Sequence, residues 1–371
     1  MTDLFFYGSL RHLPLLEIVL GRAVGAGQLA AARLADHAVH VIAGDSWPTI
    51  QPAAGAAAPG LLLRGASAED VARLDYYESG FGYALRPVAV ATAEGGVVQA
   101  RMWGPQAAAH EAGAPWQLAD WAARWGAISC RAAVEAMAYY GRITPAELAR
   151  RYGPMLLRAA ARVAMQARPA DPVHDLSRDV RLVDHRFAYV DFYGMEEARL
   201  QFRRHDGSMS PELERSALMT GAAAVVLPYD PVLDAVLLVE QFRAPLYLSG
   251  DPAPWLWEPV AGLIDPGETP DQAAHRETME EAGLTLRRLE KVGEAYSSSG
   301  SSSEYVHLYV GLADLAGAEG IGGLASEGED IRSQVLSFEA LMDGVERHSY
   351  RDMPLLITAL WLARHRDRLR G

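Results

Sequence analysis

The stretch Gly262–Leu284, GLIDPGETPDQAAHRETMEEAGL, decides how the second half of the chain folds. A proline suited to the first helical turn and a glycine suited to the helix end predict a helix over residues 270–282. On that helix Glu277, Glu280 and Glu281 stand at i, i+3 and i+4, so one face carries three carboxylates. Such charges repel one another, and a hard divalent cation such as Mg²⁺ would offset the repulsion. The alternative is an ordinary solvated acidic face.

The same stretch places Gly262, Glu268, Arg276 and Gly283 at fixed spacings around the glutamates. The pattern resembles the Nudix box, G-x5-E-x7-R-E-U-x-E-E-x-G-U. Only Thr278 departs from it, because a bulky aliphatic residue is usual there, and we expect this to affect helix packing rather than metal chemistry. The resemblance implies a diphosphate hydrolase that acts on a nucleoside diphosphate linked to a further group.

Residue roles follow from this resemblance. Glu277 and Glu281 match the family's main metal ligands, and Glu280 stands beside them among the catalytic residues. The carbonyl of Ala261, next to the box, is a further expected ligand. The implied cofactor is Mg²⁺, with Mn²⁺ as a substitute, which screens the pyrophosphate charge and holds the attacking water. The remaining box positions shape the loop and helix: Gly262, Glu268, Arg276 and Gly283.

Sequence on both sides of the box is similar to the ADP-ribose pyrophosphatase group. The expected reaction is hydrolysis of ADP-ribose or a related ADP-sugar to AMP and a sugar phosphate. At Ser299 this chain lacks a proline that is typical of ADP-ribose hydrolases, so ADP-glucose and GDP-mannose stay open as substrates. The stretches that carry the resemblance are Phe192–Met195, Asp206–Ser210, Glu240–Arg243, Trp257–Gly262 and Gly323–Arg332.

The resemblance also implies substrate contacts outside the box. Arg243 and Arg215 would hold the phosphate or ribose, since a guanidinium fork suits phosphate oxygens. Glu258 is expected among the substrate-binding residues. Phe192 or Tyr193 would stack on the adenine across a dimer interface, although plain strand packing explains two aromatic residues equally well.

A glycine-rich segment, residues 317–328, is expected to close over the substrate. Glu327 matches the general base of the group, and Glu329 lies two residues further on, near the metal ligands. The sequence does not decide which of the two is the base, and flexibility of the segment could equally mean disorder.

The N-terminal sequence resembles the γ-glutamylcyclotransferase-like fold through Phe5–Leu10 and Leu74–Glu78. In that family the loop offers backbone N–H groups and a hydroxyl to the substrate, and the glutamate acts as acid and base in the release of 5-oxoproline. Glu78 is therefore an expected catalytic residue, with a pKa raised by burial. The alternative is a ligand-binding or docking module for the hydrolase. The loop residues expected to bind substrate are Tyr7, Gly8, Ser9 and Leu10.

The expected fold class is α+β with two domains: an N-terminal mixed β-barrel with helices and a C-terminal α/β/α sandwich. Short strands are expected at 37–43, 60–64, 86–92 and 97–103, interrupted by Gly, Pro and Ala-Gly stretches. A hairpin turn is expected at Pro228–Pro231. The expected boundaries are 1–105 for the first domain, 106–167 for a helical extension, 168–180 for a linker and 181–371 for the Nudix part.

Charge is distributed unevenly along the 371 residues. The net charge is −13, from 47 acidic and 34 basic side chains, and residues 1–180 hold 16 of each kind. The whole excess therefore lies in residues 181–371. An acidic chain argues against nucleic acid or an anionic membrane as a partner. Cys130 is the only cysteine, which excludes an intramolecular disulfide and a thiolate cluster.

No apolar run is long enough to span a membrane, and the N-terminus does not read as a signal peptide, so a cytoplasmic location is expected. The pairing of the two halves resembles the tellurite-resistance-type ADP-sugar pyrophosphatases of bacteria. A homodimer through the Nudix part is expected. Two alternatives stay open: a nucleotide-sensing regulator without turnover, and a protein whose main activity is the N-terminal cyclotransferase.

Overall fold

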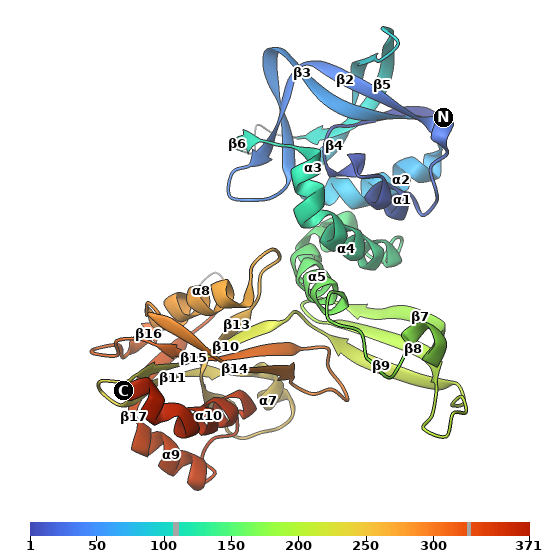
Figure 1. Cartoon of the computed structure of the whole chain (residues 1–371). Coiled ribbons are helices and arrows are strands. Elements are labelled where there is room, and N and C mark those ends of the chain that lie inside the picture. The colour runs from blue at the N-terminus through green and yellow to red at the C-terminus, as the bar shows by residue number, and fades with distance from the viewer. Residues whose placement is uncertain (107–110, 325–327) are drawn as a thin grey trace. The chain divides into compact units, whose positions relative to one another are not determined.

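The computed structural model describes residues 1–106, 111–324 and 328–371. The chain divides into two compact units, Met1–Leu218 and Met219–Gly371, which are treated separately below (Figure 1). None of the described helices is long and apolar enough to cross a membrane.

The second unit is built on a mixed sheet with the order β14-β15-β10-β11-β17-β16. Its parallel pair, β10 and β15, lies inside the sheet, and β12 and β13 pair with β11 and β10. The strands are β10 (Ala223–Asp230), β11 (Ala235–Phe242), β12 (Trp255–Glu258), β13 (Val260–Leu263), β14 (Arg288–Tyr296), β15 (Tyr305–Leu312), β16 (Gly320–Gly322) and β17 (Ile331–Ser337).

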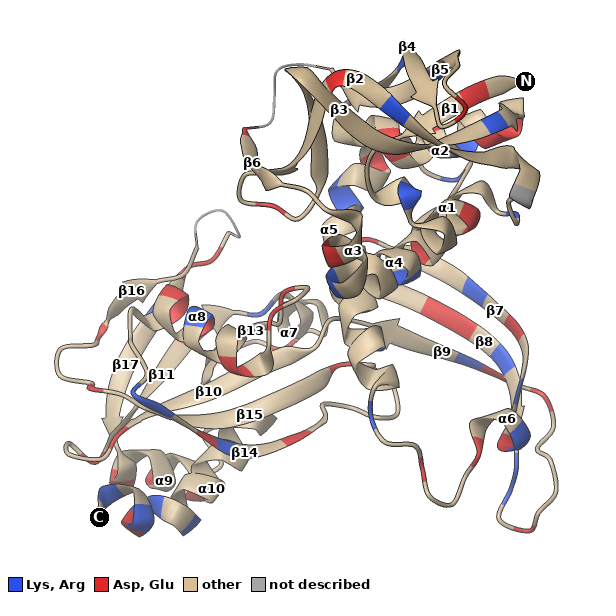
Figure 2. Ribbon diagram, turned by 45° about the horizontal axis from the view of Figure 1, so that its top comes forward, with Lys and Arg blue, Asp and Glu red and all other residues tan. Residues whose placement is uncertain are grey.

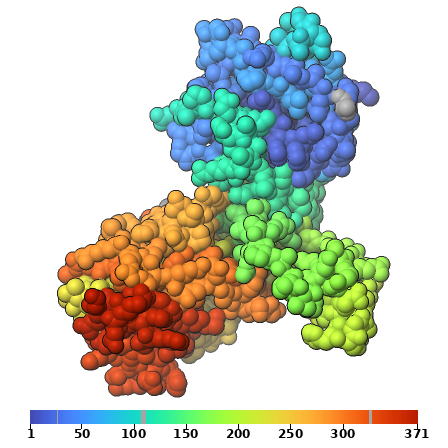
Figure 3. Space-filling model, in the orientation of Figure 1, coloured from blue at the N-terminus to red at the C-terminus, as the bar shows by residue number. Residues whose placement is uncertain are grey.

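Helices cover both faces of this sheet (Figure 1). Val226 of β10 packs with Ala273 of α8, whereas its neighbour Leu227 packs with Leu355 of α10, because successive strand residues point to opposite faces. This confirms the expected α/β/α sandwich. The C-terminal segment, red in Figure 3, lies at the surface of this unit. The helices are α7 (Ala244–Leu248), α8 (Pro270–Ala282), α9 (Phe338–Glu346) and α10 (Met353–Arg370).

The turn between β10 and β11 lies later than expected. Pro228 and Tyr229 belong to β10, where they pair with β15, and the chain turns at residues 231–234. Asp234 takes the left-handed conformation (φ 55°) that ends the turn. The prediction was wrong because Pro228 lacks only an N–H donor, and burial of the strand on both faces outweighs that loss.

The first unit contains a closed five-stranded barrel, which confirms the mixed β-barrel expected there. Its strands follow the order β3-β1-β5-β4-β2, and β2 returns to pair with β3. The elements are β1 (Thr2–Phe6), η1 (Ser9–Arg11), α1 (Leu13–Leu20), η2 (Ala26–Gln28), β2 (Leu29–Ile42), β3 (Pro48–Ala66), α2 (Ala68–Glu78), η3 (Ser79–Phe81), β4 (Tyr83–Thr92), β5 (Val97–Pro105) and the edge strand β6 (Ala112–Pro115).

One long strand replaces the interrupted strands expected before residue 67. β3 runs without a break through a stretch rich in Ala, Pro and Gly, paired with β2 along most of its length and with β1 at its end. The register shifts between Ala35 and His37 absorb the irregularity, with Asp36 at φ 54°. Pairing with two neighbours therefore overrides the poor strand propensity of these residues.

Helices α4 and α5 pack on the barrel, and a three-stranded sheet follows them. Thr144 caps α5 through a capping box with Glu147. The core of the first unit includes Tyr139, directly after α4, and Phe187 of β7. The expected boundary of the Nudix part at residue 181 stays a prediction. The elements are α3 (Leu118–Trp121), η4 (Ala122–Gly126), α4 (Ala127–Ala138), α5 (Pro145–Gln166), α6 (Leu176–Asp179), β7 (Val180–Val190), β8 (Gly194–Phe202) and β9 (Leu213–Met219).

Candidate active site

Helix α8 forms as the sequence predicts and carries Glu277, Glu280 and Glu281. Acidic residues on this helix are red in Figure 2. Thr269 caps its first turn, and Gly283 ends it in the left-handed conformation (φ 64°). Glu281 is almost completely buried, with 1% of its surface exposed, and its Oε2 accepts a hydrogen bond from the backbone N–H of Ala261 at 3.2 Å. The helix thus turns one acidic side chain into the protein next to β13.

The Glu281 carboxylate sits among other acids. The pKa of Glu281 is raised to about 9, mainly by burial and to a smaller extent by the nearby Glu277, Glu329 and Glu258. The Ala261 N–H lowers the pKa but does not compensate for this. The surroundings of Glu281 therefore destabilise its ionised form, and a nearby cation would stabilise it.

Gly262 is required by the close approach of Glu277. A Cβ added at residue 262 would lie 2.0 Å from Cδ and Oε1 of Glu277, far inside van der Waals contact. The carboxylate therefore lies directly over the backbone of β13, beside Ala261. This explains in physical terms why the box begins with glycine.

Arg276 connects the helix to the preceding loop. Its guanidinium donates to Glu268 at 2.9 and 3.1 Å and to the carbonyl of Leu263 at 2.9 Å. It also donates to Glu277 at 2.6 Å and to Glu280 at 3.0 Å. Hydrogen bonding to Glu268 is the main cause that raises the pKa of Arg276, so the guanidinium stays charged and braces both elements.

A divalent cation fits the chemistry of this donor set. The backbone at Ala261 and the carboxylates of Glu277 and Glu281 are hard oxygen ligands brought to one place. In the arrangement described, Arg276 satisfies Glu277 and Glu280 in part. Among residues 1–106, 111–324 and 328–371, no three Asp, Glu, His or Cys side chains are close enough to form a metal site by themselves.

A second polar group lies at the ends of β11 and β12. The Nε of Arg243 donates to Oε1 of the buried Glu258 at 2.9 Å. Burial raises the pKa of Glu258, and the facing guanidinium lowers it by less. Asp352, which caps α10 by accepting from Leu355 at 2.8 Å, acts electrostatically on both residues. Asp352 was not expected from the sequence, where it signals only a helix start.

Glu329 is described, whereas Glu327 lies outside the described residues. Oε2 of Glu329 accepts a hydrogen bond from the backbone N–H of Leu324 at 3.0 Å. Because Glu329 also contributes to the raised pKa of Glu281, its carboxylate belongs to the same acidic surroundings. The choice between Glu327 and Glu329 as general base stays open.

Three expected substrate contacts lie in the first unit. Phe192 and Tyr193 occupy the turn between β7 and β8, 53% and 42% exposed, with their rings edge to face. The carbonyl of Phe192 accepts from Arg158 at 2.7 Å, and that buried guanidinium also pairs with Glu135. Arg215 is exposed on β9. The substrate roles of these residues stay predictions.

A cavity of about 200 Å³ lies in the first unit beside the barrel. The expected loop residues, Tyr7 to Leu10, line it together with Glu78. Burial raises the pKa of Glu78 to about 7. The structure thus brings together the residues predicted from two separate stretches, Phe5–Leu10 and Leu74–Glu78. It also adds Trp47 and Tyr152, for which the sequence held no recognisable signal.

Two profiles of known families each match part of this chain. A profile described as NUDIX domain matches residues 219–354, and one described as gamma-glutamyl cyclotransferase, AIG2-like, matches residues 4–123. An ADP-ribose pyrophosphatase of Escherichia coli (strain K12) is 39% identical over 200 residues, which cover 54% of this chain and 95% of that protein. An ADP-ribose pyrophosphatase of Haemophilus influenzae is 36% identical over 168 residues, covering 45% of this chain and 77% of that protein.

A GDP-mannose pyrophosphatase of Cronobacter sakazakii is more distant, with 29% identity over 177 residues, 48% of this chain and 91% of that protein. The identity to the Escherichia coli protein, which extends over nearly all of its length, is sufficient to establish the family. This chain belongs to the Nudix hydrolases, in the group that includes these pyrophosphatases, and carries an N-terminal domain of the gamma-glutamyl cyclotransferase, AIG2-like family.

Proposed function

We propose that the Nudix part hydrolyses the pyrophosphate of ADP-ribose or a related ADP-sugar to AMP and a sugar phosphate. The observation that carries this proposal is the buried Glu281 carboxylate, with Glu277 and Glu329 in its surroundings. Such a group is stable in its ionised form only beside a cation. The relatives named ADP-ribose pyrophosphatase and GDP-mannose pyrophosphatase supply the substrate class.

Mg²⁺ is the cofactor we propose, with Mn²⁺ as a substitute. The residues that would hold it are Glu277, Glu281 and the carbonyl of Ala261. When bound, the metal supplies charge neutralisation at the pyrophosphate and an activated water. Arg276 keeps the box loop in place through Glu268, so that the ligand-bearing face of α8 stays aligned with β13.

The remaining roles concern substrate and proton transfer. Arg243, oriented by Glu258, would donate to a phosphate or ribose oxygen, since its guanidinium keeps donors beyond the one that Glu258 accepts. Glu327 or Glu329 would take the proton of the attacking water. Phe192 or Tyr193 would stack on adenine, with the protein acting as a homodimer through the Nudix part.

A hydrolysis screen tests this proposal. Purified protein is incubated with ADP-ribose, ADP-glucose and GDP-mannose, with Mg²⁺ or with EDTA, and the nucleoside monophosphate is measured. We expect release of AMP from an ADP-sugar that requires Mg²⁺. Absence of metal-dependent turnover on all three substrates would contradict the proposal and favour the nucleotide-sensing regulator instead.

A second candidate activity, γ-glutamylcyclotransferase, is favoured by one observation in the first unit. Glu78 lines the cavity next to the Tyr7–Leu10 loop and has a pKa near 7, which suits acid and base catalysis. Release of 5-oxoproline from a γ-glutamyl amine measures it. We place it second because none of the described residues that line the cavity is Lys, Arg or His, so only the Tyr7–Leu10 loop is available for the substrate's carboxylate.

A further inference from the structure

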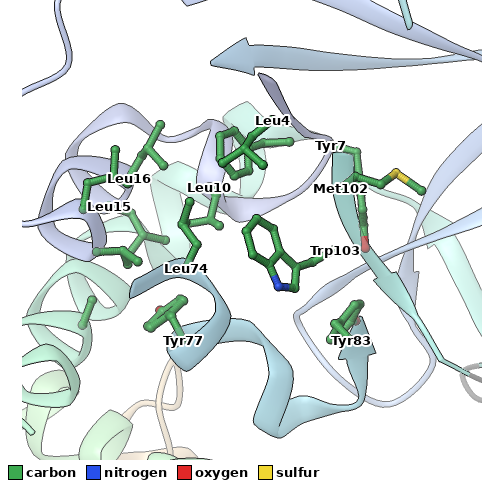
Figure 4. Packing of buried hydrophobic residues seen from close by; sticks show 14 of the residues in the cluster. Leu4, Tyr7, Leu10, Leu15, Leu16, Leu74, Tyr77, Tyr83, Met102 and Trp103 are labelled. Atoms are coloured by element: carbon green, nitrogen blue, oxygen red, sulfur yellow. The ribbon is translucent and has the colours of Figure 1, made fainter. Parts of the chain in front are cut away.

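Helix α5 connects the core of the first unit to the turn between β7 and β8. In its first half, the hydroxyl of Tyr152 shares a hydrogen bond of 2.7 Å with the hydroxyl of Tyr77 on α2. Figure 4 shows Tyr77 among the buried side chains of that core. Arg158 lies about 9 Å further along the helix axis, at a rise of about 1.5 Å per residue, and contacts the turn at residues 191–193. One helix therefore joins the core to this turn.

The Arg158 side chain is buried, with 5% of its surface exposed, and its donors point in two directions. Nε and one terminal nitrogen donate to the carboxylate of Glu135 on α4, at 3.1 and 2.6 Å. The other terminal nitrogen donates to the carbonyl of Phe192 at 2.7 Å and to that of Asp191 at 3.4 Å. Glu135 thus balances the charge of the guanidinium, and the remaining donors hold the turn.

The backbone of the turn lies directly against this guanidinium. A Cβ added at Gly194, the first residue of β8, would lie 3.0 Å from Nε of Arg158. The turn is also closed by its own backbone, since the N–H of Asp191 donates to the carbonyl of Tyr193 at 2.9 Å. A planar guanidinium loses little freedom when it makes several hydrogen bonds at once. Arg158 therefore fixes the backbone on both sides of Phe192.

A second cluster of charged side chains holds β8 just beyond the turn. Glu196 of β8 accepts hydrogen bonds from Arg162 of α5 at 3.1 Å and from Arg131 of α4 at 3.3 Å. Nε2 of His185, on β7, lies 2.6 Å from Oε2 of the same carboxylate. The hairpin of β7 and β8 is therefore bound to both helices of the extension.

The two aromatic rings of the turn are left exposed although its backbone is fixed. Phe192 and Tyr193 are 53% and 42% exposed, and their rings meet edge to face at 5.0 Å between centroids. A flat base can stack on such rings. Because the backbone is already ordered, a ligand that stacks there loses less free energy to ordering the protein.

We propose that Arg158 is a positioning residue for nucleotide binding, because it holds the turn that carries Phe192 and Tyr193 toward adenine. The assignment rests on the proposed function, in which one of these rings stacks on the adenine of the ADP-sugar. Arg158 lies outside both regions that match family profiles, residues 4–123 and 219–354. The helical extension, as well as the Nudix part, then sets the affinity for the nucleotide half of the substrate.

Two ligands that divide the substrate test this role by calorimetry on the full chain with Mg²⁺. AMP carries the adenine, and ribose 5-phosphate lacks it. Arg158→Lys keeps a positive charge beside Glu135, but an ammonium group does not reproduce the planar fork that also reaches both carbonyls. We expect AMP to bind this variant about tenfold more weakly, from the loss of base stacking, and ribose 5-phosphate to bind within about twofold of the unaltered protein.

Kinetics separate positioning from chemistry. The proposed metal ligands lie in the second unit and are not altered in Arg158→Lys. We therefore expect KM for the ADP-sugar to rise about tenfold while kcat stays within about threefold, as when binding alone is lost. In a chain with Phe192→Leu and Tyr193→Leu, Arg158→Lys should weaken AMP by less than about twofold, because the rings that it positions are already gone.

Gly194→Ala tests the same contact without replacing either charged residue. Its methyl group would press on Nε of Arg158 from 3.0 Å, so we expect AMP to bind roughly threefold more weakly. Two substitutions on α5 are matched controls and should bind AMP like the unaltered protein. They are Gly153→Ala, where an added Cβ meets nothing within 4 Å, and Arg150→Lys, at an exposed arginine. Melting curves verify that each variant is folded.

Three results would overturn the role of Arg158. They are unchanged AMP affinity in both Arg158→Lys and Gly194→Ala, an equal loss for ribose 5-phosphate and AMP, or a full loss from Arg158→Lys that persists without the two rings. Failure of the proposed function is seen in the unaltered protein instead, which would then bind no AMP and hydrolyse no ADP-sugar. In that case the assignment of Arg158 would be wrong as well.

Discussion

Two carboxylates with raised pKa values, Glu281 in the second unit and Glu78 in the first, lie among different neighbouring groups. Both are raised chiefly by burial, Glu281 to about 9 and Glu78 to about 7. The nearby carboxylates of Glu277, Glu329 and Glu258 also raise the pKa of Glu281, and its side chain accepts a hydrogen bond from the backbone N–H of Ala261. Glu78 is surrounded by aromatic rings instead.

The difference indicates what each site can hold. A cluster of carboxylates around Glu281 can share a small ion of high charge, which suits a divalent metal. The cavity beside Glu78 has Asp45 as its other acidic lining residue and is otherwise lined mainly by aromatic and aliphatic side chains, which suits an organic ligand rather than a bare metal ion. Burial of an acid is thus common to both sites, and the neighbouring groups decide the chemistry.

The largest expected effect comes from removing the charge of Glu281. Glu281→Gln keeps the size of the side chain but removes one carboxylate from the metal-binding set. We expect the Mg²⁺-dependent hydrolysis rate to fall by about 10²-fold or more, comparable to the loss of a major contributor to the transition state. Glu327→Gln should show a loss of the same order.

Glu339→Gln, an exposed glutamate on α9, is the matched control and should keep the full rate. Circular dichroism verifies the fold of each variant. If Glu281→Gln and Glu327→Gln both keep the unaltered rate on every substrate, the proposed mechanism is wrong.

A smaller loss is expected when the backbone under Glu277 is altered. In Gly262→Ala the new methyl group would lie 2.0 Å from the Glu277 carboxyl carbon, so the carboxylate must move away from β13. We expect about a tenfold loss in hydrolysis, less than a charge removal, because both ligands remain present. Gly293→Ala, where an added Cβ meets nothing within 4 Å, is the control and should cost less than twofold.

The two carboxylates should also be distinguished by stability. Because folding raises both pKa values above the ordinary 4.5, each group favours the folded state fully below pH 4.5. That contribution is lost as pH rises, up to about 7 for Glu78 and about 9 for Glu281. In EDTA we therefore expect the melting temperature to fall between pH 5 and pH 8.

Calorimetry with and without Mg²⁺ assigns this loss. Glu281→Gln and Glu78→Gln should each raise a melting transition at pH 8 in EDTA, by about 3 °C or more. Mg²⁺ should abolish the advantage of Glu281→Gln, because the metal then neutralises the unaltered carboxylate, and leave that of Glu78→Gln intact. Equal responses to Mg²⁺ would refute the distinction drawn between the two sites.

The sequence predicted the Nudix helix well because its signals are local. Thr269, Pro270 and Gly283 mark the ends of α8, and the three glutamates follow from helical spacing alone. Tyr152 and Asp352 could not be predicted, because each joins its site through tertiary packing of a distant helix. Their local sequence shows only helix, and pairing along β3 likewise depends on strands far away in the chain.

The smallest effect on hydrolysis is expected from a substitution on the face of α8 that packs into the core, opposite the face that carries the metal-binding glutamates. Thr278 is fully buried, and its hydroxyl donates to the carbonyl of Ala274 at 2.7 Å, where the Nudix box usually has an aliphatic residue. Thr278→Val keeps the shape and removes a hydroxyl that competes for a helical carbonyl. We expect hydrolysis to stay within twofold and the melting temperature to change by no more than about 3 °C. Steady-state kinetics measures this. A tenfold loss would show that the core face of the helix, as well as the neighbouring carboxylates, determines the state of Glu281.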